Sequence, residues 1–178
     1  MRLIRPCAMI VCLLFTAAAA GLPVYVTPQI DQLRHADAIL VLSGPFHRRY
    51  SFGMDLARHG WAPNLVISNP SGAADRKLTD YCAAPHPGFA VHCIVPDPVT
   101  TKGEARQLRR LASEYGWDTV IVVTFRPHIS RARFILEQCF DGDLVMVESP
   151  ADISKSRWVY EYLYQTAGYV RTVLQPGC

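Results

Sequence analysis

The sequence lacks the signatures of several common enzyme classes. It has no G-x-x-x-x-G-K-[ST] loop, no G-x-S-x-G motif and, after its first predicted strand, no G-x-G-x-x-G fingerprint. Neither H-E-x-x-H nor C-x-x-C occurs, and the six histidines show no comparable ligand spacing. These absences give no support to P-loop, α/β-hydrolase, zinc-ribbon or metal-dependent chemistry, and we predict no metal site.

A strong excess of charge is also absent. Eighteen basic and fifteen acidic residues leave a net charge of +3, with no lysine-rich tail and no basic run interleaved with aromatics. Nucleic acid is therefore not an expected partner. No internal repeat occurs, and 178 residues are enough for one domain with a full core, which we place at residues 36–178.

Residues 1–30 differ in composition from the rest of the chain. Arg2 and Arg5 precede an uncharged run from residue 7 to residue 27, which is long enough for a membrane-spanning helix. The charge pattern predicts that the following domain lies outside the cytoplasm. A cleaved signal peptide is the alternative, since residues 16–21 are small. Both interpretations export the domain, as a single-pass cell-membrane protein or, after cleavage, as a secreted one.

Four cysteines lie beyond this segment, and their even number suggests two disulfides in an exported domain. Cys82 and Cys93 would close a short loop rich in Pro, Gly and His. Cys139 and Cys178 would tie the end of the chain to the helix near residue 139. Four buried thiols are the alternative.

Five apolar runs alternate with helical patterns. The run at 119–123, TVIVV, is unbroken and mostly β-branched, which is typical of a parallel strand covered on both faces. Similar runs occur at 36–44, 64–68, 91–95 and 143–148. The pattern predicts an α/β fold, a doubly wound, mostly parallel, five-stranded Rossmann-like sheet with helices on both faces. In the last predicted helix, 154–174, one face would hold Trp158, Tyr162, Gln165, Tyr169 and Val173.

Right-handed crossovers restrict the order of the strands. The common order 3-2-1-4-5 would place the first and fourth strands side by side, where the winding of the sheet reverses. The loops that leave them, residues 43–49 and 124–130, would then face each other across one crevice. Ligands of such sheets bind at this kind of position, and the arginines and histidines of both loops predict an anionic ligand.

The turn after the fourth strand carries most of the candidate chemistry. Ser130 is a candidate N-cap for the next helix, and Arg131 in its first turn could hold a phosphate or carboxylate. His128 lies where the field of the helix disfavours the imidazolium, so it could pass a proton. The alternatives are a solvated basic turn, a backbone hydrogen bond for His128 and an ion pair between Arg131 and Asp97.

Two further positions have competing interpretations. Arg49 could be a second anion clamp or an ordinary charge on a helix surface. The segment from Thr101 to Glu104 fits a capping box, in which Thr101 caps the helix and Glu104 reaches back. Glu104 could instead act as a carboxylate in the crevice.

Four segments resemble the SanA/YdcF/ElyC-like family of bacterial envelope proteins. VTFRPHISRA at 123–132 resembles the family signature V-T-x-x-x-H-x-x-R-A, and TTKGEA at 100–105 resembles N-T-x-E-N-A. ADAILVLSG at 36–44, followed by Arg49 and by GWAP at 60–63, resembles the family's first strand, its arginine and its G-x-A-P. LVISNPSG at 65–72 stands where members show a serine and paired glycines.

The resemblance implies a Rossmann-like domain, often behind one N-terminal membrane helix. It implies roles in envelope integrity, in cell-wall or lipid-carrier metabolism or, in one branch, in S-adenosylmethionine binding. Gly44-Pro45 and Asn69-Pro70 replace glycine pairs of the family, so these loops are stiffer here and the ligand can differ. Carried over by position, the site would consist of His128, Arg49, Arg131, Thr124 and Thr101, lined by Ser43, Gly44 and Ser68.

These observations lead to one hypothesis. The chain is an exported, membrane-anchored envelope protein that binds a phosphate-bearing or otherwise anionic small molecule, such as a lipid-linked polyprenyl phosphate or a nucleotide sugar. Its role would be in envelope biogenesis or homeostasis. If it is a hydrolase or transferase, His128 would be the catalytic acid or base and Thr124 a polar positioner. The alternatives are a non-catalytic envelope interaction module and a nucleotide- or S-adenosylmethionine-binding domain; the residues identify no cofactor.

Overall fold

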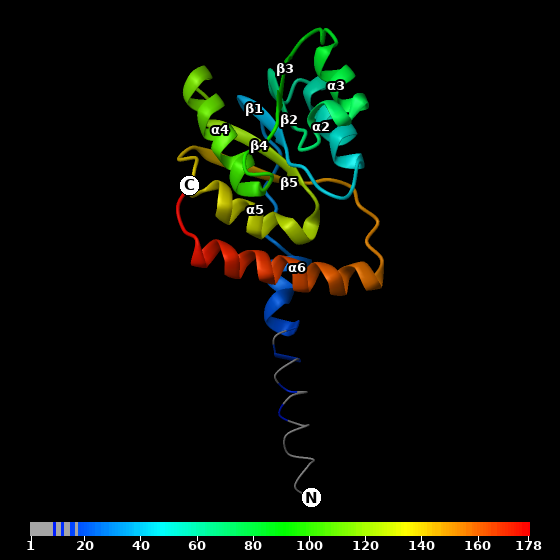
Figure 1. Cartoon of the computed structure of the whole chain (residues 1–178), viewed down its shortest axis with the longest axis vertical. Coiled ribbons are helices and arrows are strands. Elements are labelled where there is room, and N and C mark those ends of the chain that lie inside the picture. The colour runs from blue at the N-terminus through cyan, green and yellow to red at the C-terminus, as the bar shows by residue number, and fades with distance from the viewer. Residues whose placement is uncertain (1–8, 10–11, 13–14, 17) are drawn as a thin grey trace, which may run out of the picture.

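The computed structural model describes residues 9, 12, 15–16 and 18–178. Helices and strands alternate through the domain, as the apolar runs predict, and a long helix follows the last strand (Figure 1). In chain order the elements are η1 (Leu22–Val26), β1 (Ala38–Val41), α2 (Arg48–Arg58), β2 (Asn64–Ser68), η2 (Gly72–Ala74), α3 (Arg76–Ala83), β3 (Ala90–Ile94), α4 (Thr101–Tyr115), β4 (Thr119–Thr124), η3 (Arg126–His128), α5 (Ile129–Leu136), β5 (Asp143–Glu148) and α6 (Lys155–Leu174).

The five strands form one sheet in the order β3-β2-β1-β4-β5, and every pair is parallel. β1 lies between β2 and β4, with Leu40 opposite Val66 on one side and Val122 on the other. The predicted order 3-2-1-4-5 is confirmed. The exits of β1 and β4 are therefore neighbours at the carboxyl end of the sheet, where the winding reverses.

Side chains of β1 alternate between two apolar layers. Ile39 and Val41 pack with residues of α2 and α3, whereas Ala38 and Leu40 pack with residues of α4 and α5. All four are fully buried, which explains why the strand shows no polar alternation in the sequence. The predicted two-sided helical cover is confirmed.

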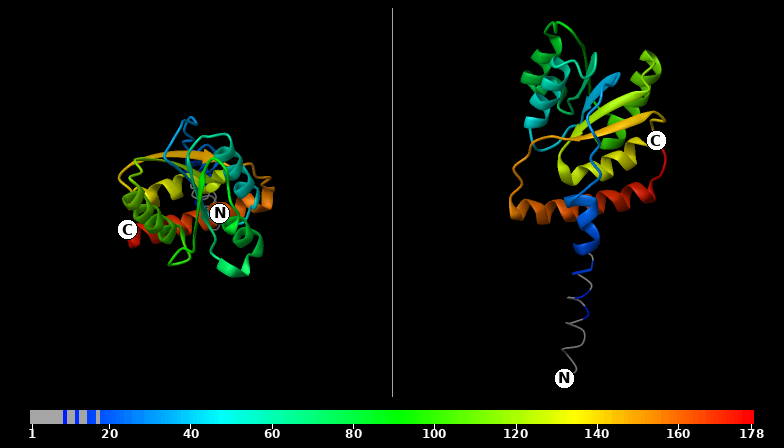
Figure 2. Two further views of the ribbon diagram at one scale, coloured as in Figure 1. Left: turned by 90° about the horizontal axis from the view of Figure 1, so that it is seen from above. Right: turned by 180° about the vertical axis from the view of Figure 1, so that it is seen from behind.

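The last helix, α6, does not cover the sheet. It packs against α5 and forms an additional layer outside it (Figures 1 and 2). Ser154 caps its N-terminus by accepting from the backbone N–H of Arg157. The predicted inner face is only partly correct. Gln165 is buried, but Val173 is 62% exposed, and the second buried residue of this helix is Glu161.

The segment before the domain leads away from the sheet beside the middle of α6 (Figures 1 and 2). The run predicted to span a membrane, residues 7–27, falls partly outside the described residues. Within the part that the structure describes, no helix is both long and apolar enough to cross a membrane. Ser130 binds this segment instead of capping α5, since its hydroxyl donates to the Val24 carbonyl at 2.8 Å. The turn η3 runs directly into α5 and leaves no N-cap role for Ser130.

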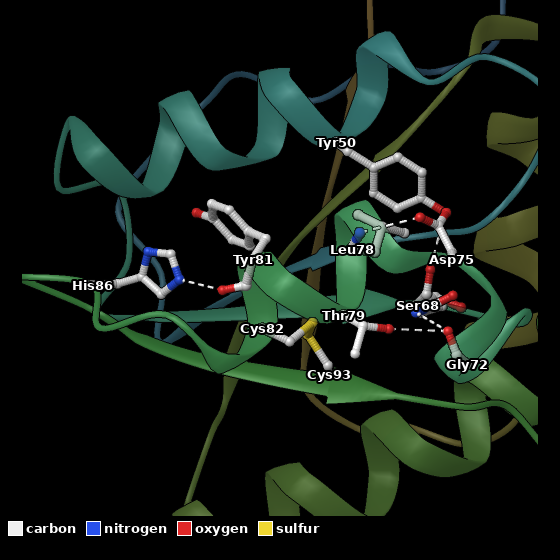
Figure 3. Close-up of a disulfide and its surroundings, with 11 residues drawn as sticks. Tyr50, Ser68, Gly72, Asp75, Leu78, Thr79, Tyr81, Cys82, His86 and Cys93 are labelled. Carbon is white, nitrogen blue, oxygen red and sulfur yellow. Dashed lines mark hydrogen bonds between the residues drawn. A yellow bond between two sulfur atoms is a disulfide. The ribbon is translucent and has the colours of Figure 1, made fainter.

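Both predicted disulfides are present, so the alternative of four buried thiols is wrong. Cys82 joins α3 to Cys93 of β3, with Cα atoms 6.0 Å apart (Figure 3). Cys139 beyond α5 joins Cys178 beyond α6, with Cα atoms 4.8 Å apart. Two such bonds in one small domain are typical of an oxidising compartment.

Candidate functional site

A cavity of about 840 Å³ lies where the carboxyl end of the sheet meets α6. Its inner wall comes from the exits of β1 and β4 and from the start of α4, and its outer wall comes from α6. Five lining side chains are basic, and the lining carboxylate, Glu161, is already paired with one of them. The basic residues are Lys102, Arg106, Arg131, Arg157 and Arg171.

Arg131 is held in the cavity by a row of polar side chains on α6. Its Nε donates to Oε1 of Gln165 at 2.7 Å. Nε2 of Gln165 donates to Oε2 of Glu161 at 2.8 Å, and Nε of Arg157 donates to Oε1 of Glu161 at 2.7 Å. Residues 157, 161 and 165 are four apart, so their side chains lie on one face of the helix. The row explains why Glu161 and Gln165 are buried at the inner face of α6.

The terminal nitrogens of Arg131 remain free for a ligand. Among the described residues, none accepts a hydrogen bond from Nη1 or Nη2 of this arginine, whereas Nε is fixed by Gln165. Burial lowers the pKa of Arg131 below its ordinary value, but a guanidinium keeps its charge. A Cβ atom on Gly168 would lie 2.8 Å from Cδ of Arg131, so glycine leaves the room that this side chain occupies. The alternative ion pair with Asp97 is wrong, because Gln165 is the partner.

His128 lies at the bottom of the cavity between two hydroxyl groups. Nδ1 is 3.0 Å from Oγ1 of Thr124, and Nε2 is 3.3 Å from Oγ1 of Thr101. Burial and the nearby charges of Arg131 and Arg49 hold the pKa of His128 well below 6.5, so the ring is neutral at pH 7. The alternative of a backbone hydrogen bond is wrong for the ring, whose partners are side chains. A neutral imidazole here can accept a proton from a ligand that reaches it.

The predicted capping box is wrong: the N-cap lies one residue earlier, and Glu104 has another partner. Thr100 is the N-cap of α4, because its backbone is extended and its hydroxyl accepts from the N–H of Gly103 at 3.3 Å. Thr101 is then the first helical residue, and its hydroxyl is directed to His128. Glu104 does not reach back to the cap. Its Oε1 accepts from the N–H of Ser43 at 2.7 Å, which fixes the loop that leaves β1.

Arg49 lies beneath the cavity wall and is fully buried. Nε donates to the carbonyl of Phe46 at 3.0 Å, and Nη1 donates to the carbonyls of Ser43 at 2.8 Å and Leu42 at 3.2 Å. Gly44, with φ of 145°, covers the guanidinium, and a Cβ atom there would lie 2.8 Å from Nη1. Arg49 therefore shapes the loop after β1, and it is neither a lining residue of the cavity nor an ordinary surface charge.

The other predicted site residues divide into two groups. Ser43, Gly44 and Thr101 line the cavity together with His128 and Arg131. Thr124 lies below it and reaches it through His128. Ser68 is buried at the end of β2, where its carbonyl accepts from the Tyr50 hydroxyl at 3.0 Å (Figure 3). Burial raises the pKa of Glu104, while nearby Ser68 and Ser43 and the charge of Arg49 act in the opposite direction.

Sequence reasoning missed the whole outer wall. Tyr160 and Tyr164 of α6 line the cavity, as do Arg157, Glu161 and Arg171. The available signal was the spacing of Arg157, Glu161 and Gln165 in steps of four, which places polar groups on one helical face.

A scan of protein-family models and a search of curated proteins find no match to this chain.

Proposed function

We propose that the protein binds a phosphate-bearing or otherwise anionic small molecule in the cavity between the sheet and α6. The observation that carries this proposal is the guanidinium of Arg131. Gln165 holds its Nε, while Nη1 and Nη2 stay free in a cavity with four further basic side chains. A guanidinium that presents two terminal nitrogens matches the oxygens of a phosphate or carboxylate. The backbone N–H groups at the start of α4 add a second source of positive potential on the same wall.

The cavity has room for more than an isolated phosphate. Its volume is about 840 Å³, and Tyr160, Tyr164 and Phe125 give part of the wall an aromatic surface. We propose a phosphate ester whose organic part contacts these rings, with lipid-linked phosphates as the leading class and nucleotide sugars as the second. The two disulfides favour an exported domain, where free nucleotides and S-adenosylmethionine are scarce.

The resemblance to the SanA/YdcF/ElyC-like family supports a role in the cell envelope. We propose that the N-terminal apolar segment tethers the domain to the outer surface of the cell membrane, since Arg2 and Arg5 precede it. If the bound molecule also reacts, as in a hydrolase or transferase, His128 is the group that takes or returns the proton. Its neutral ring lies between Thr101 and Thr124, and Arg131 would hold the negative charge.

The proposal is tested by titrating the full chain in detergent with geranyl phosphate, with geraniol as the uncharged control and with inorganic phosphate. We expect binding of geranyl phosphate, no binding of geraniol, and a loss of about tenfold or more in affinity for Arg131→Gln. Arg109→Gln is the matched control, since it removes one exposed arginine of α4 that does not line the cavity. Equal affinity of Arg131→Gln and Arg109→Gln would overturn the proposal.

Two further measurements identify the ligand and separate the alternative function. Native mass spectrometry of the protein purified from its host membranes would give the mass of a co-purifying phosphate ester. A non-catalytic interaction module predicts that a folded Arg131→Gln/His128→Asn double variant keeps its function in cells. The binding proposal predicts that this variant loses it.

A further inference from the structure

The helix α6 is polar on its buried side and apolar on its exposed side. Glu161 and Gln165 are each 1% exposed and face the cavity. The opposite side carries four large apolar side chains, which we call the outer face of α6: Val159, Leu163, Val170 and Leu174, exposed by 65%, 71%, 54% and 75%. A helix on the surface of a water-soluble domain has the reverse arrangement.

The spacing of these residues makes the outer face continuous. Positions 159, 163, 170 and 174 differ by four, seven and four residues, which keeps them on one side of an α-helix. The face extends over most of the helix, and no described element of the chain packs on it. A contiguous apolar surface of this kind marks an interaction site.

The N-terminal segment identifies the partner. Tyr25 packs against Tyr162 of α6 with ring centroids 5.0 Å apart, and its hydroxyl is 2.8 Å from Oγ1 of Thr166. From there the described part of the segment leads away from the domain, across rather than along α6 (Figures 1 and 2). The segment is exposed and apolar too, since Phe15 is 75% exposed and Leu22 is 50% exposed.

The borders of the outer face have the composition of a membrane interface. Tyr160 and Tyr164 lie along one border, and Arg171 follows them on the same side of the helix. Lys155 begins the helix with a further positive charge. Tyrosine rings and basic side chains beside an apolar stripe suit the level of lipid headgroups, where the charges meet anionic phosphates.

We propose that α6 lies in the surface of a bilayer containing anionic phospholipids, with its outer face in contact with the acyl chains. The N-terminal segment enters the same bilayer beside the middle of the helix. Because Tyr160, Tyr164 and Arg171 also line the cavity, its mouth then opens at the level of the headgroups. The contact between α6 and the bilayer does not rest on the ligand proposed for the cavity.

Photochemical crosslinking of the full chain tests this contact. A benzophenone-bearing amino acid replaces Leu163 or Val170, and the protein is reconstituted in vesicles of phosphatidylcholine with or without phosphatidylglycerol. The same replacement at Val95, which is 56% exposed beyond the end of β3, is the control for general apolar exposure. We expect phospholipid adducts at Leu163 and Val170, more of them with phosphatidylglycerol, and none at Val95.

A charged variant sharpens the test. With the reporter at Leu174, the Leu163→Glu/Val170→Glu variant should lower the adduct yield about tenfold, while Val95→Glu leaves it unchanged. An intact Cys139–Cys178 disulfide and an unchanged circular dichroism spectrum show that the variant is folded. Crosslinks between two copies of the chain at Leu163, or adducts as frequent at Val95 as at Leu163, would overturn the proposal. Failure of geranyl phosphate to bind would leave these expectations unchanged and would count only against the cavity ligand.

Discussion

The Nε atom of Arg131 donates to Oε1 of Gln165 at 2.7 Å, and this bond joins α5 to α6 across the cavity. The bond holds the guanidinium of Arg131 in one position, although an arginine side chain is otherwise flexible. Since an ordered arginine loses less conformational entropy when it binds an anion, the bond should raise affinity without contacting the ligand.

Replacing Gln165 with leucine should weaken binding without unfolding the protein. The shape of the side chain is nearly kept, but Arg131 loses its acceptor and Glu161 loses one of its donors. We expect affinity for geranyl phosphate to fall about tenfold. Titration calorimetry measures this loss. Gln107→Leu on α4 is the control, since Gln107 does not line the cavity. If Gln165→Leu binds as tightly as the wild type, α6 does not position the guanidinium of Arg131.

Replacing Gly168 with alanine should separate stability from binding. Alanine favours a helix interior over glycine by about 1 kcal/mol, so the free energy of unfolding should stay level or rise. The new Cβ atom would meet Arg131 at 2.8 Å and displace its side chain from Gln165. We expect affinity for geranyl phosphate to fall in a protein that melts at the same or a higher temperature. A drop in both quantities would indicate a repacked α6 rather than a displaced arginine.

Arg49 and Arg48 are neighbours, but replacing them should have effects of very different size. Arg49→Met leaves the carbonyls of Leu42, Ser43 and Phe46 without their donor and should cost about 3–5 kcal/mol of unfolding free energy. Arg48→Met removes an exposed pair with Asp152 and should cost less than about 1 kcal/mol. Urea denaturation of both variants measures the difference, and similar values would contradict the structural role of Arg49.

His128 should make the protein less stable in mild acid. Its pKa in the folded state lies well below the value of 6.5 expected in the unfolded chain. Below pH 6.5 the unfolded chain therefore binds a proton that the folded protein does not, and the free energy of unfolding falls as the pH falls, by at most about 1.4 kcal/mol per pH unit. Between pH 7 and 5, the wild type should lose more stability than His128→Gln, and the difference should average up to about 1 kcal/mol per pH unit.

Urea denaturation at each pH measures this difference. Glu104, whose pKa is raised in the folded state, contributes with the opposite sign as the pH falls through that raised pKa, because its proton binds more readily to the folded protein. Comparing the two chains at the same pH cancels that contribution. Parallel pH profiles for wild type and variant would show that the pKa of His128 is the same in the folded protein and in the unfolded chain, which would contradict the prediction.

The sheet and its order were predictable because every strand is a short apolar run bounded by turns. β2 and β5 begin and end at the predicted residues, and β1 is shorter than the run at 36–44 because its ends belong to loops. The positions of His128 and Arg131 at one crevice followed from the strand order, whereas Thr101 was placed there only by the family resemblance. The cap of α4 did not, because two adjacent threonines offer the same chemistry and only the extended backbone of Thr100 decides between them.

Apolar periodicity alone could not predict the outer wall of the cavity. Periodicity assigns apolar side chains of a helix to the interior, and α6 reverses this rule, with Glu161 buried and Leu163 exposed. The burial of Arg49 was also not predictable, since its partners are the backbone carbonyls of a loop whose path the sequence does not specify.

The outer wall of the cavity belongs to a single helix of 20 residues that follows the last strand. None of its side chains completes the two apolar layers that cover the sheet. If the cavity binds a ligand as proposed, exchanging this one peripheral segment would change its selectivity, while His128 and Arg131 on the inner wall stay the same. The residues of α6 that line the cavity are thus separate from those that form the core, and directed evolution of ligand binding could begin with this helix alone.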